Sequence, residues 1–143
     1  MKAPCLMIWN GGFSVLHDAL SEPWMMTRSA IQTFRNAVCY DAAGATCTII
    51  DVHPICDVTL PDRLLPWHPS PVRLELQPGP DLSPGDVRAR IVQILQKDSE
   101  IADFLKMPVD EAIASVREAE TPVALIEAAK AVLQHEGASS IRW

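Results

Sequence analysis

Prolines are the feature that most restricts how this chain can fold, because eight of the twelve lie between Pro54 and Pro84. Proline lacks a backbone N–H and fixes φ, so a segment this rich in proline suits neither a helix interior nor a long central strand. The prolines therefore separate two parts of different character. Residues 1–80 are β-rich, the proline-rich loop covers 54–84, residues 81–137 have helical patterns and residues 138–143 form a tail.

This order of elements predicts an α+β fold. The chain has 143 residues, of which 48% are hydrophobic, and that is enough apolar surface to build one core without a metal or disulfide scaffold. We expect a single domain over 1–143. In it, a small antiparallel sheet from the N-terminal half carries three to four C-terminal helices packed on one face.

One hairpin is predicted over residues 38–52, where β-branched and aromatic residues flank a turn. The turn has Asp41 at its first position and Gly44 at its last, which is typical of a type I turn followed by a left-handed glycine. Counting outward from this turn places Cys39 opposite Cys47 on one face of the sheet. We expect both thiols to be free and mostly buried, because a disulfide across such a pair is strained.

The other elements of the front part are predicted from shorter patterns. Residues 5–16 carry two apolar runs around Asn10-Gly11, which favours a second hairpin, although a helix starting near Phe13 fits the same residues. A short helix is expected over 27–34. Residues 72–76 alternate apolar with charged side chains, so we expect a strand with one face in water.

Helices are predicted after residue 81 from capping residues and from apolar residues at helical spacing. Ser83 is followed by Pro84 and, two residues later, by Asp86, which is a typical helix start. Four helices are expected: one from Ser83 to about Lys97, one from Ser99 to the residue before Pro108, one over 109–116, and one from Thr121 to a stop at Gly137. In the second of these we expect Phe104 to point inward.

Charge argues against a nucleic-acid partner. The net charge is −6, and both parts are acidic, with 5 basic and 7 acidic residues over 1–80 and 7 and 11 over 81–143. A phosphate backbone needs a basic surface. Segment 99–119 has two short predicted helices around a turn, as in a helix-turn-helix, but it carries five acidic residues against Lys106 and Arg117. DNA binding by this segment is therefore the weaker alternative.

The sequence also predicts where the protein works. No apolar run approaches the roughly 20 residues that a membrane-spanning helix needs, and no signal-peptide cleavage site follows the first apolar run. The four cysteines include no C-x-x-C pair and no dense disulfide framework. We therefore expect a cytoplasmic protein with reduced thiols, no membrane partner and no cofactor.

His53 and Cys56 are the candidate metal ligands, because their spacing matches that of paired ligands in structural zinc sites. The same pair could serve a small enzyme that uses a thiol nucleophile, and three acidic residues nearby could assist acid–base chemistry: Asp51, Asp57 and Asp62. Signatures of hydrolases, kinases and nucleotide-binding proteins are missing from the sequence. A small enzyme or metal-binding protein is accordingly the second interpretation.

Two aromatic segments beside prolines point to protein interaction. One contains Trp24, Met25 and Met26, and the other contains Trp67 and His68. Tryptophan is enriched at interaction hot spots and methionine adapts to irregular partners. Alternatively, Trp24 and Trp67 fold over the core of the chain itself. We predict a non-catalytic interaction or accessory module that associates with itself as a homo-oligomer, most simply a dimer, or binds another protein.

Overall fold

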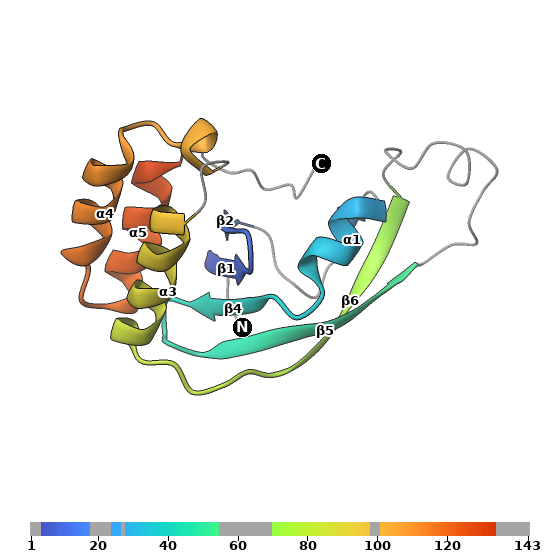
Figure 1. Ribbon diagram of the computed structural model, residues 1–143. Coiled ribbons are helices and arrows are strands. Elements are labelled where there is room, and N and C mark those ends of the chain that lie inside the picture. Colours follow the sequence, from blue (N-terminus) through green and yellow to red (C-terminus); the bar gives the residue numbers. More distant parts are fainter. Residues whose placement is uncertain (1–3, 18–23, 27, 55–69, 98–100, 134–143) are drawn as a thin grey trace.

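The computed structural model describes residues 4–17, 24–26, 28–54, 70–97 and 101–133 (Figure 1). The strands are β1 (Cys5–Trp9), β2 (Gly12–Leu16), β3 (Trp24–Met26), β4 (Val38–Asp41), β5 (Thr46–Pro54) and β6 (Ser70–Pro78). The helices are α1 (Arg28–Phe34), α3 (Pro84–Lys97), the 3-10 turn η1 (Ile101–Phe104), α4 (Val109–Arg117) and α5 (Pro122–Val132). The fold is α+β, as predicted from the order of the elements.

The strands form one antiparallel sheet in the order β2-β1-β4-β5-β6-β3. β1 and β2 form the predicted hairpin around Asn10-Gly11, with Trp9 opposite Gly12, so the alternative helix from Phe13 is wrong. A strand is favoured because both of its faces are buried in different cores. Leu6 of β1 belongs to one core, whereas Met7 belongs to the other.

The predicted turn between β4 and β5 is confirmed. Gly44 has φ +84°, and the N–H of Asp41 donates to the carbonyl of Ala45 at 3.0 Å. The buried carboxylate of Asp41 accepts hydrogen bonds from the N–H groups of Ala43 and Ala45 through Oδ1, which fixes the turn from inside. Cys39 therefore lies opposite Cys47, and both cysteines are buried and form no disulfide.

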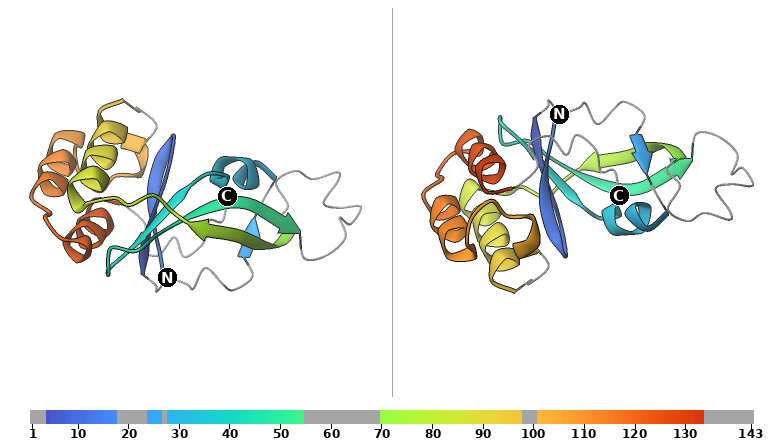
Figure 2. Two further views of the ribbon diagram at one scale, coloured as in Figure 1. Left: turned by 90° about the horizontal axis from the view of Figure 1, so that it is seen from below. Right: turned by 90° about the horizontal axis from the view of Figure 1, so that it is seen from above.

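Two apolar cores lie on opposite faces of the sheet. Figure 2 shows α3, α4 and α5 apart from α1, with strands between them. Helices α3, α4 and α5 gather over the end of the sheet that contains β1, β2 and β4. Helix α1 and strands β3, β5 and β6 contribute to the second core, on the other face. The C-terminal helices thus occupy one face, as predicted, but they cover only part of it.

Helix α3 begins where the sequence predicted. The N–H of Asp86 donates to Ser83 Oγ at 3.1 Å, and the N–H of Ser83 donates to Asp86 Oδ2 at 3.0 Å. These reciprocal bonds satisfy donors that the first turn of a helix leaves free. Within the described residues, no helix is both long enough and apolar enough to cross a lipid bilayer.

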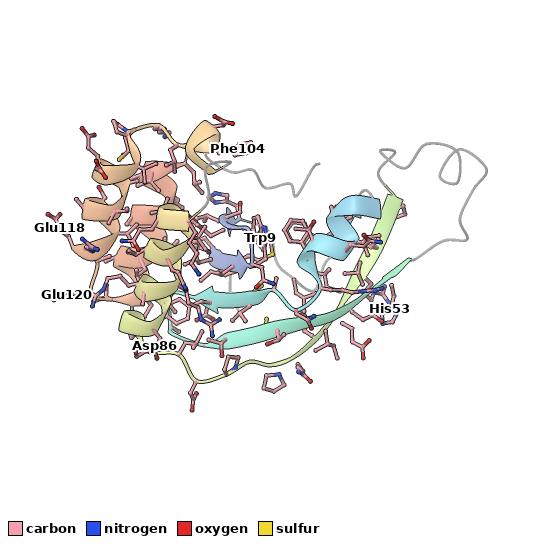
Figure 3. All side chains as sticks on the ribbon, in the orientation of Figure 1. Trp9, His53, Asp86, Phe104, Glu118 and Glu120 are labelled. Atoms are coloured by element: carbon pink, nitrogen blue, oxygen red, sulfur yellow. The ribbon has the colours of Figure 1, made fainter. Side chains whose placement is uncertain are left out.

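Two helices differ from the prediction, one in its winding and the other in the residue at which it ends. Residues 101–104 form a 3-10 turn, and Phe104 is 46% exposed instead of pointing inward (Figure 3). Leu105 is buried and forms an isolated β-bridge with Leu133. Because Leu133 takes an extended conformation to form this bridge, α5 ends at Val132, before the predicted stop. Gly137 lies outside the described residues.

The strand predicted over residues 72–76 is confirmed, but it is longer than expected from the prolines. β6 includes Pro71 and Pro78. Both stand near the ends of the strand, where the missing N–H costs few ladder bonds. The rest of the proline-rich loop, over 55–69, lies outside the described residues.

Replacing Gly44 tests the turn. An added Cβ would lie 3.7 Å from Pro122 Cγ, which leaves room for it, so the cost of Gly44→Ala comes from the positive φ alone. We expect the free energy of unfolding to fall by about 1–2 kcal/mol. Urea unfolding followed by circular dichroism measures the change.

Gly85→Ala is the matched control for this substitution. Gly85 lies in the first turn of α3, where an added Cβ has space and φ is not positive. We expect no loss of stability there, or a gain of up to about 1 kcal/mol, since alanine favours the helix. Equal effects of the two substitutions would contradict the strained conformation of Gly44.

Candidate functional site

Six polar side chains occupy the part of the sheet that the C-terminal helices leave open. Register and alternation place them on the same face as Tyr40, which packs under those helices. We call this set the polar face, and it consists of Thr48, Asp51, His53, Arg73, Glu75 and Gln77. Each of them is exposed or half-buried. The main contacts of the C-terminal helices with the sheet are made with β1, β2 and β4.

A β-bulge in β5 determines which of its residues reach this face. Ile49 pairs with Leu76 and Asp51 pairs with Glu75, so Ile50 has no partner on β6. Ile49 is buried in the second core, and strict alternation would place Asp51 beside it. The extra residue reverses the alternation. Val52 is therefore buried, while Asp51 and His53 face outward.

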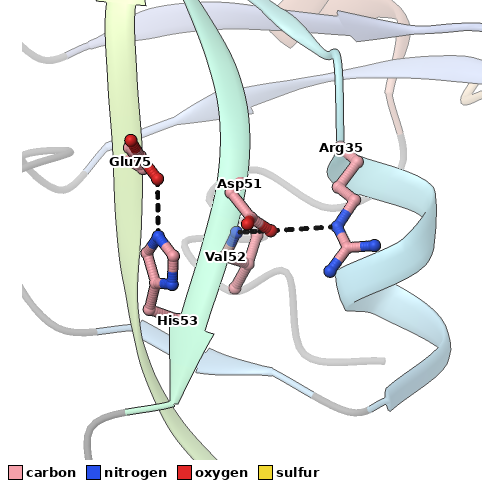
Figure 4. Close-up of polar contacts among 5 residues, drawn as sticks. All are labelled: Arg35, Asp51, Val52, His53 and Glu75. Carbon is pink, nitrogen blue, oxygen red and sulfur yellow. Dashed lines mark hydrogen bonds and ion pairs between the residues drawn. The ribbon is translucent and has the colours of Figure 1, made fainter.

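Asp51, His53 and Glu75 lie together at the centre of the polar face (Figure 4). His53 Nε2 lies 2.6 Å from Glu75 Oε2. One nitrogen or oxygen atom from each of the three side chains lies within 4.8 Å of the other two. Such a set of one imidazole and two carboxylates can hold a metal ion or a proton between its members.

Asp51 is oriented by neighbours outside this set. Its Oδ1 accepts a hydrogen bond from the N–H of Val52 at 2.8 Å and from Arg35 Nε at 3.1 Å. Arg35 directly follows the last residue of α1 (Figure 4). The helix packs on one face of the sheet, whereas Asp51, which the Arg35 side chain contacts, belongs to the opposite face. The four charged side chains are 40 to 55% exposed, which leaves them well solvated.

The contacts shift two pKa values in opposite directions. The hydrogen bond with Glu75 raises the pKa of His53 above its ordinary value of about 6.5, because it favours the protonated imidazole. The N–H of Val52, and then the charge of Arg35, lower the pKa of Asp51. Near neutral pH the site therefore holds a carboxylate at Asp51 and a histidine that readily takes up a proton.

The structure brings together only part of the predicted site. His53 meets Asp51, which the sequence named, and Glu75, which it did not. Cys56, Asp57 and Asp62 lie outside the described residues. Two signals pointed toward Glu75: the alternation over 72–76 put it on the wet face, and Asp51 and His53 are two residues apart. Neither signal gives the register between β5 and β6.

The predicted aromatic segments lie elsewhere. Trp24 is 5% exposed and Met26 is fully buried, so both belong to the second core, as in the interpretation that Trp24 folds over the core. The side chain of Met25 and the residues Trp67 and His68 lie outside the described part of the chain. The described side chains of this segment therefore pack in the second core and do not form an exposed aromatic patch.

Among the described residues, neither the buried thiol of Cys39 nor segment 99–119 supplies a second candidate site. Hydrogen bonds with Cys47 and Cys5, and then burial, raise the pKa of Cys39, so its thiol is a poor nucleophile. Over 101–119, the described part of segment 99–119, the structure has one 3-10 turn and one α-helix instead of two helices. The exposed side of α4 carries Asp110 and Glu111, which phosphates would repel.

Replacing Glu75 tests the electrostatics of the site. In Glu75→Gln the carboxylate is lost, so we expect the pKa of His53 to fall, as measured by NMR titration of the imidazole in the presence of EDTA. A raised pKa in the folded state stabilises the protein fully below about pH 6.5, and this contribution is lost as the pH rises through the folded value. Glu75→Gln should weaken that pH dependence of the free energy of unfolding.

Glu127→Gln is the control, because it removes a carboxylate that pairs with Lys130 on α5 at 3.3 Å. We expect it to leave the pKa of His53 unchanged. A His53 pKa that is the same in both variants and in the original protein would mean that the contact with Glu75 does not persist in solution.

No family model, curated protein or solved structure matches this chain. Its candidate site is therefore defined by geometry alone. It consists of a histidine and two carboxylates from adjacent strands, brought to one face by a bulge, oriented by Arg35 and Val52, and open to solvent.

Proposed function

We propose that this chain is a non-catalytic interaction or accessory module that associates with a second copy of itself through the polar face. The observation that carries the proposal is the exposure of its charged side chains. Asp51, His53 and Glu75 of this face, and Arg35 paired with Asp51, are each 40 to 55% exposed. Acid–base catalysis depends on groups that a cleft removes from water, whereas a recognition surface presents solvated groups to a partner.

Charge favours a second copy as the partner. The chain has a net charge of −6, so most pairs of surfaces on two copies repel each other. The polar face differs because it combines basic with acidic groups: Arg73 lies two residues from Glu75 on β6, and Arg35, at the end of α1, pairs with Asp51. A two-fold axis would bring the basic groups of one copy to the acidic groups of the other.

We also propose that the module works in a reducing compartment, the cytoplasm being the simplest case. The three described cysteines are buried and form no disulfide. They lie side by side in one core, where reduced thiols behave as small apolar side chains. Disulfides are rare in such compartments.

Charge reversal at Arg73 tests the proposed contact surface. We expect light scattering to give a mass of two chains for the original protein at micromolar concentration, in the presence of EDTA. Arg73→Glu adds repulsion across the two-fold contact, so it should shift the protein toward a single chain. Added salt should weaken the original dimer as well, because the pairs are exposed.

Arg117→Glu is the control, since it makes the same change of charge at an exposed residue at the end of α4. It should leave the dimer intact. A mass of one chain for the original protein would contradict self-association, and equal effects of both reversals would contradict the polar face as the interface.

A further inference from the structure

We infer that Asp51, His53 and Glu75 form a binding site for a divalent transition-metal ion, and that Zn²⁺ is the ion that suits them best. The three ligands belong to one chain, so a monomer can hold the ion. The inference goes beyond the proposed self-association and does not depend on it.

The chemistry of the ligands selects the class of ion. An imidazole nitrogen favours zinc, copper, iron or nickel, whereas Mg²⁺ and Ca²⁺ prefer sites made of oxygen alone. Two carboxylates supply the negative charge that offsets a divalent ion. Zn²⁺ accepts such mixed nitrogen and oxygen sets without a strict preference for one geometry, and three protein ligands leave one position for water.

The backbone already holds the three ligands on one face. Asp51 and Glu75 are opposite each other in the ladder between β5 and β6, and His53 follows Asp51 by two residues on the same side of the bulge. The ladder fixes the positions of the Cα atoms. Ion binding therefore has to order side chains only, which lowers its entropic cost.

Asp51 is oriented so that one oxygen stays available. Both of its hydrogen-bond donors, Val52 N and Arg35 Nε, bind Oδ1. Among the described residues, Oδ2 has no such donor. Outer contacts of this kind hold metal-binding carboxylates in place.

The spacing of the ligand atoms lies close to that of a zinc site. The three atoms lie within 4.8 Å of one another. Around a zinc ion, with bonds near 2.1 Å, two ligand atoms are about 3.4 Å apart in a tetrahedral arrangement. The difference requires only rotation of exposed side chains and no movement of the strands.

The ion would bind between His53 and Glu75, where the two side chains already make contact. Their 2.6 Å separation fits a proton held between a nitrogen and an oxygen. Zn²⁺ would take the place of this proton, which is released to the solvent as nitrogen and oxygen lone pairs bind the ion. No redox step or second reactant is needed.

Isothermal titration calorimetry of the full chain with ZnCl₂, under reducing conditions and after removal of metal with EDTA, tests the site. We expect one ion bound per chain, with little competition from a large excess of Mg²⁺. In NMR spectra, Zn²⁺ should shift the imidazole resonances of His53 and leave those of His17 unchanged. His17 is exposed and follows β2 at another part of the sheet.

Substitutions identify the ligands. His53→Ala, Asp51→Asn and Glu75→Gln should each weaken the affinity for Zn²⁺ at least about tenfold, which is the lower end of the loss seen even for outer contacts. His17→Ala is the matched control and should bind like the original chain. Cys56→Ser separates this site from the zinc-knuckle pair that the sequence suggested, and it should also bind like the original chain. Far-UV circular dichroism verifies that each variant is folded.

Three results would overturn the inference: no binding by the original chain, unchanged affinity in Glu75→Gln and Asp51→Asn, or loss of binding in Cys56→Ser with Glu75→Gln unaffected. Each of these results can be distinguished from a failure of the proposed self-association. Self-association is measured as mass in EDTA, whereas the site is measured as heat and chemical shift on adding Zn²⁺, so either can fail alone.

Discussion

One extra residue in β5, Ile50, reverses the inside–outside alternation of the strand, and the arrangement of the polar face depends on that reversal. Before the bulge, Ile49 is buried. After it, Val52 is buried, whereas Asp51 and His53 on either side of it are not. An unbulged strand would bury Asp51 in the second core. The bulge therefore allows β5 to contribute Cys47, Ile49 and Val52 to the second core and still present charged side chains to water.

The C-terminal helices divide the sheet into two regions. Where they pack over β1, β2 and β4, both faces of the sheet are covered by apolar packing. Beyond these helices, β5 and β6 are packed on one face only. Antiparallel sheets tolerate this because each strand can keep one face solvated. A site on the open half can change by substitution with little effect on either core.

Helix α1 and the residue after it make contacts on both faces of the sheet. Its residues Ala30 and Phe34 belong to the second core, while Arg35, at its end, binds Asp51 on the polar face. An exposed ion pair of this kind contributes little to stability. Its more important effect is to restrict the carboxylate to one orientation, which matters for any ligand that needs the free oxygen.

Local chemistry in the sequence determined the elements whose signals are short in range. The turn from Asp41 to Gly44 was predictable because one side chain and one glycine conformation fix it. The start of α3 was predictable because Ser83 and Asp86 satisfy each other's N–H groups. The pairing of Cys39 with Cys47 followed from the turn by counting.

Tertiary structure decided everything that depends on contacts between distant segments. Phe104 faces outward because Leu105 is the residue that bridges to Leu133, at the far end of the helical part. Trp24 is buried because β3 pairs with β6, a strand about fifty residues later in the chain. His53 meets Glu75 only through the register between β5 and β6, which the bulge sets. The sequence by itself determined the fold class and the residue types of the site, because these follow from local conformational preferences. It could not determine which of those residues meet, because the register of two strands joined by a long loop is decided by how their apolar faces pack.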